Sequence, residues 1–319
     1  MSFDFLDKHS LDLHHFSTEA ETEFLVQDFI AKERIVMYWA DGGTGKSTLA
    51  YALINYIQIN HKMRMVTIID PDNPLDELRV KKVDSILMKY DNLKVIHSET
   101  LLIRAIEVLD ELVSYVSPDF YKDCLFLLDS AREFVDVDNN KAVQSFMEQV
   151  KKLRSAGATV IIIMHGNKDG KNYQGSNHFF NSCDAISKVR KGSIQKDGKF
   201  VYIIDTSKGR AGAKSCAFSV NINNYHLEQI SYDIATLSNY DAEFIAKVTP
   251  ILKENKDGIN QKNLLEALGL PEDNKAGREA LSKFTDKYWK VIKGLKNANF
   301  YHLIVEDTAH TEQTGAEHE

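Results

Sequence analysis

The sequence predicts an α/β fold, in which a twisted and mostly parallel β-sheet is covered by helices on both faces. From residue 35 to about 165, apolar strand-like runs alternate with amphipathic helical segments, as in successive βαβ units. The runs are apolar throughout, which is typical of strands that are buried on both sides. A glycine-rich loop that ends in Gly45-Lys46-Ser47 joins the first run to a helix. These features predict one large domain with a phosphate-binding loop.

The strands and helices of this domain follow from the same pattern. We expect strands at 35–40, 65–69, 93–97, 125–128 and 159–164, and helices directly after residue 45 and near 74–90, 100–116 and 139–156. A polar loop, 166–182, then leads to strands at 185–190 and 200–205, which flank the turn signal Lys196-Asp197-Gly198-Lys199. The sheet should therefore continue with antiparallel strands. A last strand at 216–222 should finish the core near residue 232.

A second, smaller α+β domain is expected after residue 235. Helices at 241–256, 261–268 and 276–285 precede strands at 288–293 and 300–305, and a polar turn at 295–299 joins these strands. Three helices followed by a hairpin predict a winged-helix-like domain. The expected organisation is a lead segment (1–30), a large domain (31–235), a winged-helix-like domain (236–307) and a disordered polar tail (308–319).

The composition of the chain argues against several classes of protein. Its 319 residues, of which 43% are hydrophobic, suffice for a sizeable core. No apolar stretch approaches the roughly 18 residues that span a bilayer, and the N-terminus lacks a signal pattern, so we expect a cytoplasmic protein without membrane contacts. The net charge of −7 argues against a generally basic surface. A few lysines on loops can nevertheless hold a nucleic-acid backbone.

The loop after residue 40 has the residues that the phosphates of a nucleotide require. Its glycines let backbone N–H groups point inward, and the following helix presents the positive end of its dipole to an anion. Lys46 would reach the β- and γ-phosphates of ATP, and the Ser47 hydroxyl would bind Mg²⁺. Ala40 stands where the pattern G-x-x-x-x-G-K-[ST] has its first glycine. The expected nucleotide-binding residues are Asp41, Gly42, Gly43, Thr44, Gly45, Lys46, Ser47 and Thr48.

Acidic residues follow two of the predicted strands. Asp129 ends a buried strand, where it can hold Mg²⁺ through water. Ser130 follows it instead of a second acid, so the carboxylate that orients the attacking water must come from elsewhere. Asp70 and Asp72, at the end of another strand, are the candidates. The same stretch also suits a helix start, because Asp, Asn and Pro favour that position, and the two roles are compatible.

The strand at 159–164 ends in His165, at the sheet edge where ligands of α/β proteins bind. A histidine there can sense the γ-phosphate. Lys168, Lys171 and Tyr173 follow on a polar loop, and this composition suits a DNA or RNA backbone. It suits an ordinary solvated loop equally well, so both interpretations stay open.

Two cations, Lys208 and Arg210, follow the predicted strand at 200–205 in a glycine-containing loop. In this position they could clamp the γ-phosphate of an adjacent subunit as a finger in trans. Such a residue raises the rate by about 10³–10⁵ in well-studied enzymes.

These motifs, in this order along residues 30–225, resemble the RecA-type core of hexameric replicative helicases (DnaB-like), most closely the small, primase-free, plasmid RepA-like group. The motifs are Gly42–Ser47, Asp70–Pro74, Leu128–Ser130, Met164–Lys168, Gln174–Ser176 and Ser207–Arg210. The resemblance implies a RecA-like ATPase domain over 31–235 and a homohexameric ring. The loops at 166–182 and 206–215 would then face a channel that holds single-stranded DNA.

The resemblance also implies a role for individual residues. Asp72 takes the position of the catalytic carboxylate, His165 that of the γ-phosphate sensor, and Lys208 with Arg210 that of the finger between subunits. The family usually has glutamate where this chain has Asp72. This shorter side chain leaves Asp70 as a rival.

The second domain is not part of that shared core. It carries a basic stretch with two aromatic residues, Tyr288 and Trp289. The lysines are Lys283, Lys287, Lys290, Lys293 and Lys296. They suit the backbone of duplex or forked DNA, and they also suit a solvated lysine face over a buried tryptophan.

The leading hypothesis is an ATP-driven, Mg²⁺-dependent ring that translocates on single-stranded DNA and separates duplex DNA in phage or plasmid replication. A first alternative is a recombinase or recombination mediator, which would form open filaments. A second is a DNA-bound regulator that nucleotide switches without appreciable turnover. A closed ring would indicate the helicase and an open filament the recombinase. Nucleotide-dependent duplex binding without turnover would indicate the regulator.

Overall fold

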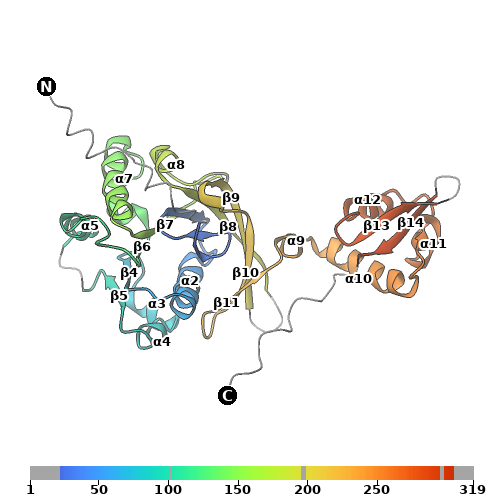
Figure 1. The fold of residues 1–319 in the computed structure, drawn as a ribbon, viewed down its shortest axis with the longest axis horizontal. Helices are drawn as coiled ribbons and strands as arrows, with labels where there is room; N and C mark the ends of the chain where they lie inside the picture. The colour runs from blue at the N-terminus through green and yellow to red at the C-terminus, as the bar shows by residue number, and fades with distance from the viewer. Residues whose placement is uncertain (1–21, 101–102, 195–198, 295–297, 305–319) are drawn as a thin grey trace, which may run out of the picture. The chain divides into compact units, whose positions relative to one another are not determined.

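The computed structural model describes residues 22–100, 103–194, 199–294 and 298–304. The chain divides into two compact units, residues 1–236 and 237–319 (Figure 1). Each unit has its own buried hydrophobic residues. The expected tail, 308–319, and residues 1–21 of the expected lead segment lie outside the described residues. The later part of that segment folds with the first unit, because β1 (Phe24–Val26) and β2 (Ile30–Ala31) form a small antiparallel hairpin.

A nine-stranded sheet of order β11-β10-β9-β8-β3-β7-β6-β4-β5 forms the centre of the first unit. Its strands are β3 (Ile35–Ala40), β4 (Met65–Asp70), β5 (Leu93–His97), β6 (Cys124–Leu128), β7 (Thr159–His165), β8 (Ala185–Ile194), β9 (Lys199–Gly209), β10 (Cys216–Asn221) and β11 (His226–Ile230). Neighbours from β8 through β3 to β5 pair in parallel, and β8 to β11 pair antiparallel. The predicted α/β fold with a mostly parallel sheet is confirmed, including its antiparallel extension.

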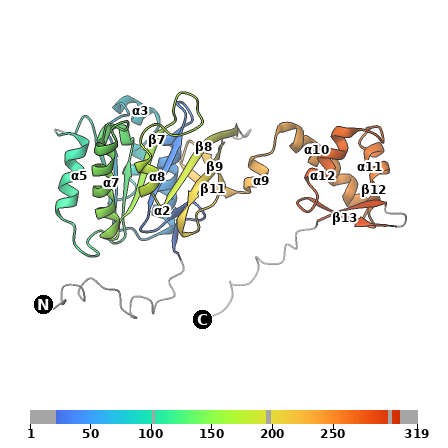
Figure 2. The ribbon, with the colours of Figure 1, turned by 90° about the horizontal axis from the view of Figure 1, so that it is seen from above.

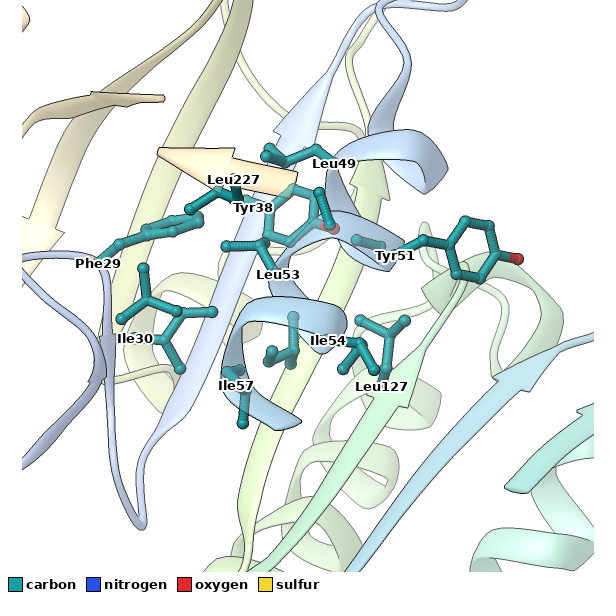
Figure 3. Close-up of a cluster of buried hydrophobic side chains, with 14 of the residues drawn as sticks. Phe29, Ile30, Tyr38, Leu49, Tyr51, Leu53, Ile54, Ile57, Leu127 and Leu227 are labelled. Atoms are coloured by element: carbon teal, nitrogen blue, oxygen red, sulfur yellow. The ribbon is translucent and has the colours of Figure 1, made fainter. Parts of the chain in front are cut away.

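Helices cover both faces of this sheet. They are α2 (Lys46–Asn60), α3 (Leu75–Val80), α4 (Asp84–Leu87), α5 (Ala105–Ser114), α6 (Ala131–Phe134), α7 (Asn140–Ser155), α8 (His178–Ser182) and α9 (Tyr232–Ala235). Successive residues of β3 enter opposite cores: Tyr38 packs with α2, and Met37 packs with α5 and α7. Figure 3 shows Leu53 and Ile57 of α2 in the core that contains Tyr38. On the other face, α5 and α7 lie side by side (Figures 1 and 2).

Two expectations for the first unit are wrong in detail. The helix expected near 74–90 is two short helices, α3 and α4, because Lys82 between them has a φ of 53°, which no α-helix accommodates. The core also has one more strand, β11, beyond the expected last strand. Of its residues only Leu227 is buried, so it lacks the apolar run that marks the other strands.

The second unit contains three helices followed by a hairpin, as expected. Its elements are α10 (Asn239–Glu254), β12 (Ile259–Asn260), α11 (Gln261–Ala267), α12 (Lys275–Lys283), β13 (Trp289–Lys293) and β14 (Asn299–Leu303). The side chains of Ser238, Asn260 and Asn274 cap the three helices by accepting hydrogen bonds from first-turn N–H groups. The strands form a sheet of order β12-β14-β13, over a core around Val248 and Trp289.

No helix in the described part of the chain is long and apolar enough to cross a membrane.

Candidate nucleotide-binding site

The glycine-rich loop connects the central strand β3 to α2 in the way the sequence predicts. Gly43 and Gly45 have φ values of 73° and 89°, which favour glycine. A Cβ atom on Gly45 would lie 2.6 Å from Oη of Tyr202, so a larger residue would clash there. No side chain caps the first turn of α2. Its free N–H groups are therefore available to an anion.

Lys46 lies beneath this loop and is only 8% exposed. Its Nζ donates hydrogen bonds to the carbonyl oxygens of Ala40 (3.1 Å) and Asp41 (3.3 Å). Burial lowers the pKa of Lys46, although nearby carboxylates such as Asp129 oppose this effect. The side chain is thus held against the loop, with its ammonium group close to where phosphates would be bound.

Ser47 and Asp129 meet although they are 82 residues apart, because Oγ of Ser47 donates a 3.0 Å hydrogen bond to Oδ2 of Asp129. Asp129 is buried, and burial together with the neighbouring Asp70 raises its pKa to about 7. The adjacent Ser130 has a buried hydroxyl oxygen without a hydrogen-bond partner. The two buried carboxyl groups have too little positive charge around them to offset their burial, and the Ser130 hydroxyl beside Asp129 has no partner. Both features fit a site that a bound divalent cation would complete.

The protein ligands alone would not suffice for such a cation. Among the described residues, no group of three or more His, Cys, Asp or Glu side chains could hold a metal ion. Ser47 and Asp129 could therefore hold Mg²⁺ only together with water or phosphate oxygens, which is the usual arrangement for this ion.

Asp70 and Asp72 have different environments. Asp70 is fully buried, and both of its oxygens accept hydrogen bonds: Tyr51 donates to Oδ2 at 3.0 Å, and Asn73 donates to Oδ1 and Oδ2 at 2.9 Å. Asp70 has no oxygen left to bind a water, so the geometry argues against Asp70 as the alternative to Asp72 for the catalytic carboxylate. The side chain of Asp72 is 45% exposed, and its Oδ2 lies 3.7 Å from Nε2 of His165. Asp72 is therefore the better placed of the two.

His165 lies at the end of β7, between the acids and the loop. Burial lowers its pKa, Lys46 lowers it further, and Asp72 acts in the opposite direction. The imidazole is consequently neutral near pH 7 and can donate or accept one hydrogen bond.

The sequence reasoning missed three residues of this site, Tyr51, Asn73 and Tyr202. Tyr51 projects from α2 (Figure 3) and bonds Asp70, and Tyr202 of β9 donates to the carbonyl oxygen of Gly45 at 3.3 Å. Asn73 was visible only as a helix-start residue. Nothing in the local sequence marks either tyrosine: Tyr51 lies in the helix after the loop but bonds an acid at the end of β4, and Tyr202 reaches the loop from the distant strand β9.

A cavity of about 330 Å³ adjoins the loop. Gly45 and Thr48 line one side, and Lys81, Phe200 and Tyr202 contribute other parts of the wall. The Nζ of Lys191 lies 4.0 Å from the centre of the Phe200 ring. The cavity thus has an aromatic wall next to the first turn of α2.

The loop after His165 exposes Lys168 and Lys171, as expected of residues that contact a backbone. Tyr173 differs, because its ring is partly buried and packs against Phe179, with the ring centres 6.4 Å apart. Its ring thus contributes to packing, and the expected contact of Tyr173 with a nucleic-acid backbone stays a prediction. A backbone hydrogen bond from Gln174 to His165 ties the loop back to β7.

Lys208 and Arg210 are not beside the phosphate-binding loop of their own chain. Gly209 pairs with Ala185 at the start of β8, and Ala185 pairs with Val36 near the start of β3, whereas the loop follows the end of β3. Lys208 bonds the Phe180 carbonyl and lies 4.9 Å from the centre of the Phe180 ring. Arg210 begins a short 3₁₀ turn and is exposed. Their expected action on a neighbouring subunit stays a prediction.

The lysines of the second unit are mostly on its surface. Lys283 is exposed as well, but its Nζ lies 2.7 Å from Oδ2 of Asp241, so its charge is paired. Lys287, Lys290 and Lys293 are exposed, and Lys296 lies outside the described residues. Trp289 is fully buried and donates a hydrogen bond to the Leu281 carbonyl. Trp289 belongs to the core, so its ring is not exposed beside the lysines and cannot stack on a nucleic-acid base.

Comparisons with known proteins give little further information. No protein-family model matches the sequence, and no curated protein matches it. The structure is similar to that of the flagellar accessory protein FlaH from Methanocaldococcus jannaschii, at 13% sequence identity and a TM-score of 0.43, over 63% of this chain and 91% of that chain. A likeness at this level carries no argument about this chain.

Proposed function

We propose that this chain binds ATP and Mg²⁺ and hydrolyses ATP, and that the hydrolysis drives translocation on single-stranded DNA and separation of duplex DNA. The observation that carries the hydrolytic part is one constellation at the carboxyl edge of the sheet. There Ser47 bonds the buried Asp129, Lys46 lies under the loop, and the exposed Asp72 lies beside His165. This arrangement supports the proposed roles of these residues in phosphoryl transfer.

The residues of the site divide the work as follows. The N–H groups of the loop and Lys46 bind the β- and γ-phosphates, while Asp72 orients the attacking water and accepts its proton. Ser47 and Asp129 would hold Mg²⁺, which supplies charge neutralisation for the phosphates. His165, neutral and next to Asp72, can hydrogen bond the γ-phosphate and report its loss to the loop that follows. The cavity lined by Phe200 and Tyr202 has room for the base and ribose.

The proposal that the motor acts on DNA rests on three observations. The order of the sequence motifs resembles that of ring helicases. The exposed Lys168 and Lys171 directly follow His165, so γ-phosphate contact and DNA contact share one loop. Lys208 and Arg210 lie away from their own phosphate site, which suits a finger that acts on the next subunit of a hexameric ring.

We also propose a DNA-binding role for the second unit. The order of its elements, α10-β12-α11-α12-β13-β14 with a sheet of order β12-β14-β13, supports the proposal of a winged-helix-like domain. The exposed Lys287, Lys290 and Lys293 lie along or beside the hairpin. Duplex or forked DNA is the partner that this arrangement suits.

The test of the proposed function combines hydrolysis, assembly and strand separation. Lys46→Ala removes charge-assisted contacts of about 1.5–3 kcal/mol each, so ATP binding should weaken and turnover should be lost. Turnover at the wild-type rate would contradict the site. Closed rings with strand displacement would support the helicase. Open filaments would indicate a recombinase instead, and duplex binding without turnover would indicate a regulator.

The finger can be tested by mixing subunits. If Arg210 completes the site of a neighbour, adding Arg210→Ala subunits to wild type should lower activity by more than simple dilution. Mixed assemblies must be verified, for example by native mass spectrometry. A strictly linear decline in such assemblies would remove the assignment.

A further inference from the structure

Asn73, the residue directly after Asp72, forms hydrogen bonds with residues of several different elements. Its Nδ2 lies 2.9 Å from both oxygens of the buried Asp70 and 3.5 Å from Oγ of Ser47. Its backbone N–H also donates to Asp70 Oδ1 at 3.1 Å. The side chain thus links the end of β4 to the hydroxyl on the metal side of the phosphate-binding loop.

His97, at the end of the neighbouring strand β5, holds the other side of Asn73. The backbone N–H of Glu99 donates to Nδ1 of His97 at 3.1 Å, so that nitrogen is an acceptor. Nε2 therefore carries the proton and donates to the carbonyl oxygen of Asn73 at 2.6 Å. Since His97 is buried, this hydrogen bond is shielded from competing water.

A third link runs toward the cavity beside the loop. Nζ of Lys81, at the C-terminal end of α3, donates to Oδ1 of Asn73 at 3.2 Å and pairs with Glu77. Lys81 also lines the cavity of about 330 Å³ next to Gly45. The side-chain amide of Asn73 therefore contacts both Ser47, the proposed Mg²⁺ ligand, and Lys81, which lines the cavity.

We propose that Asn73 is a positioning residue for hydrolysis, which holds the turn 70–74 so that Asp72 faces the phosphate site. Asp72 itself is exposed, and its side chain lies within ion-pair distance of His165 alone among the described residues. Its direction must therefore be set by the backbone of the turn, which Asn73 fixes to Asp70 on one side and to His97 on the other. This inference rests on the proposed ATP hydrolysis.

The experiment compares the full-length wild type with Asn73→Ala, His97→Leu and His97→Gln. Asn60→Ala is the matched control, since Asn60 makes a single exposed contact with Tyr56 at the other end of α2. The measurements are kcat from phosphate release, the Kd of ATP from equilibrium titration, and the Mg²⁺ concentration for half-maximal rate. Thermal unfolding checks that each variant is folded.

We expect Asn73→Ala to lower kcat by about 10²-fold, because a displaced catalytic group loses that much, with a change of less than about threefold in the Kd of ATP. The Mg²⁺ requirement should rise. His97→Leu should lower kcat in the same way. His97→Gln should restore it, because the Gln amide N–H can replace the Nε2–H donor. Asn60→Ala should match wild type.

Two results would overturn the inference alone. One is a kcat of Asn73→Ala within about twofold of the wild type. The other is a parallel loss of affinity and kcat in all three variants, with His97→Gln no better than His97→Leu, which would indicate a purely structural role. The His97 pair decides the matter if Asn73→Ala does not fold. A wild-type chain that fails to bind ATP would overturn the proposed function, and this inference with it.

Discussion

The phosphate-binding edge of the first unit and the β13–β14 hairpin of the second both combine charged and aromatic residues, but they differ in whether the charged groups are buried. At the edge the charged groups are inside: Lys46 is 8% exposed and Asp129 is 4% exposed, and their hydrogen-bond partners come from other elements. In the hairpin the aromatic Trp289 is inside, and Lys290 and Lys293 remain in solvent.

The difference indicates how much each region says about function. Burying charged groups costs several kcal/mol unless they are paired, so a cluster of such groups at one sheet edge needs a compensating purpose. Lysines on the solvated face of a hairpin cost almost nothing to keep there. The edge therefore argues strongly for a site, whereas the hairpin lysines need a binding measurement.

The largest effect should separate the two acids of the edge. Asp72→Asn should keep ATP binding and lower kcat by about 10²–10⁴-fold, because it removes the base that accepts the proton of water. Asp70→Asn should mainly destabilise the unit, by about 1–3 kcal/mol, since it disrupts buried hydrogen bonds to Tyr51 and Asn73. Phosphate release and urea unfolding measure the two effects. The reverse pattern would return the catalytic role to Asp70.

A matched pair of glycines compares the two regions directly. Gly45 and Gly258 both have φ near 90°, and a Cβ would lie 2.6 Å from the Tyr202 hydroxyl in one case and 2.4 Å from the His302 ring in the other. Alanine at either position should cost at least about 1–2 kcal/mol of folding free energy. Only Gly45→Ala should also lose ATP binding. Equal nucleotide affinities of the two folded variants would show that the loop does not hold the phosphates.

The salt dependence of DNA binding tests the exposed lysines of each region. Replacing Lys168 and Lys171 by Ala should lower the slope of log K against log salt for single-stranded DNA by about 0.7 per lost phosphate contact. Replacing Lys290 and Lys293 should instead change the slope for duplex DNA, by about 0.9 per contact. Fluorescence anisotropy over a salt series measures both. If the second pair leaves duplex and forked DNA affinity unchanged, the second unit does not bind DNA through this hairpin.

The smallest effect concerns the ion pair within the second unit. The hydrogen bond from Lys283 lowers the pKa of Asp241 in the folded state. The stabilisation is therefore complete above the unfolded pKa of about 4 and is lost as the pH falls through the lower, folded-state pKa. Lys283→Ala should cost less than about 1 kcal/mol at pH 7, because one partner is largely exposed. Thermal unfolding of wild type and variant should converge at acidic pH, and a gap that widened there would contradict the pairing.

Much of the fold could be predicted from the sequence, because the signals for it are local. The buried strands β3, β6 and β7 are apolar runs whatever surrounds them. Gly43 and Gly45 of the loop are needed by the backbone path itself. The edge strand β11 and the break between α3 and α4 were not predictable in this way, since one buries a single residue and the other depends on the unusual φ of Lys82.

The sequence by itself determined the order of the main strands and helices, the phosphate-binding loop and the set of candidate acids, because hydrophobic periodicity and loop chemistry act over a few residues. Only the tertiary structure decided which candidates work together. It buried Asp70 against Tyr51 and Asn73, left Asp72 beside His165, packed the partly buried ring of Tyr173 against Phe179 and placed Arg210 away from its own loop. These outcomes depend on which strand ends meet at one edge of the sheet, and strand order is set by contacts between segments far apart in the chain.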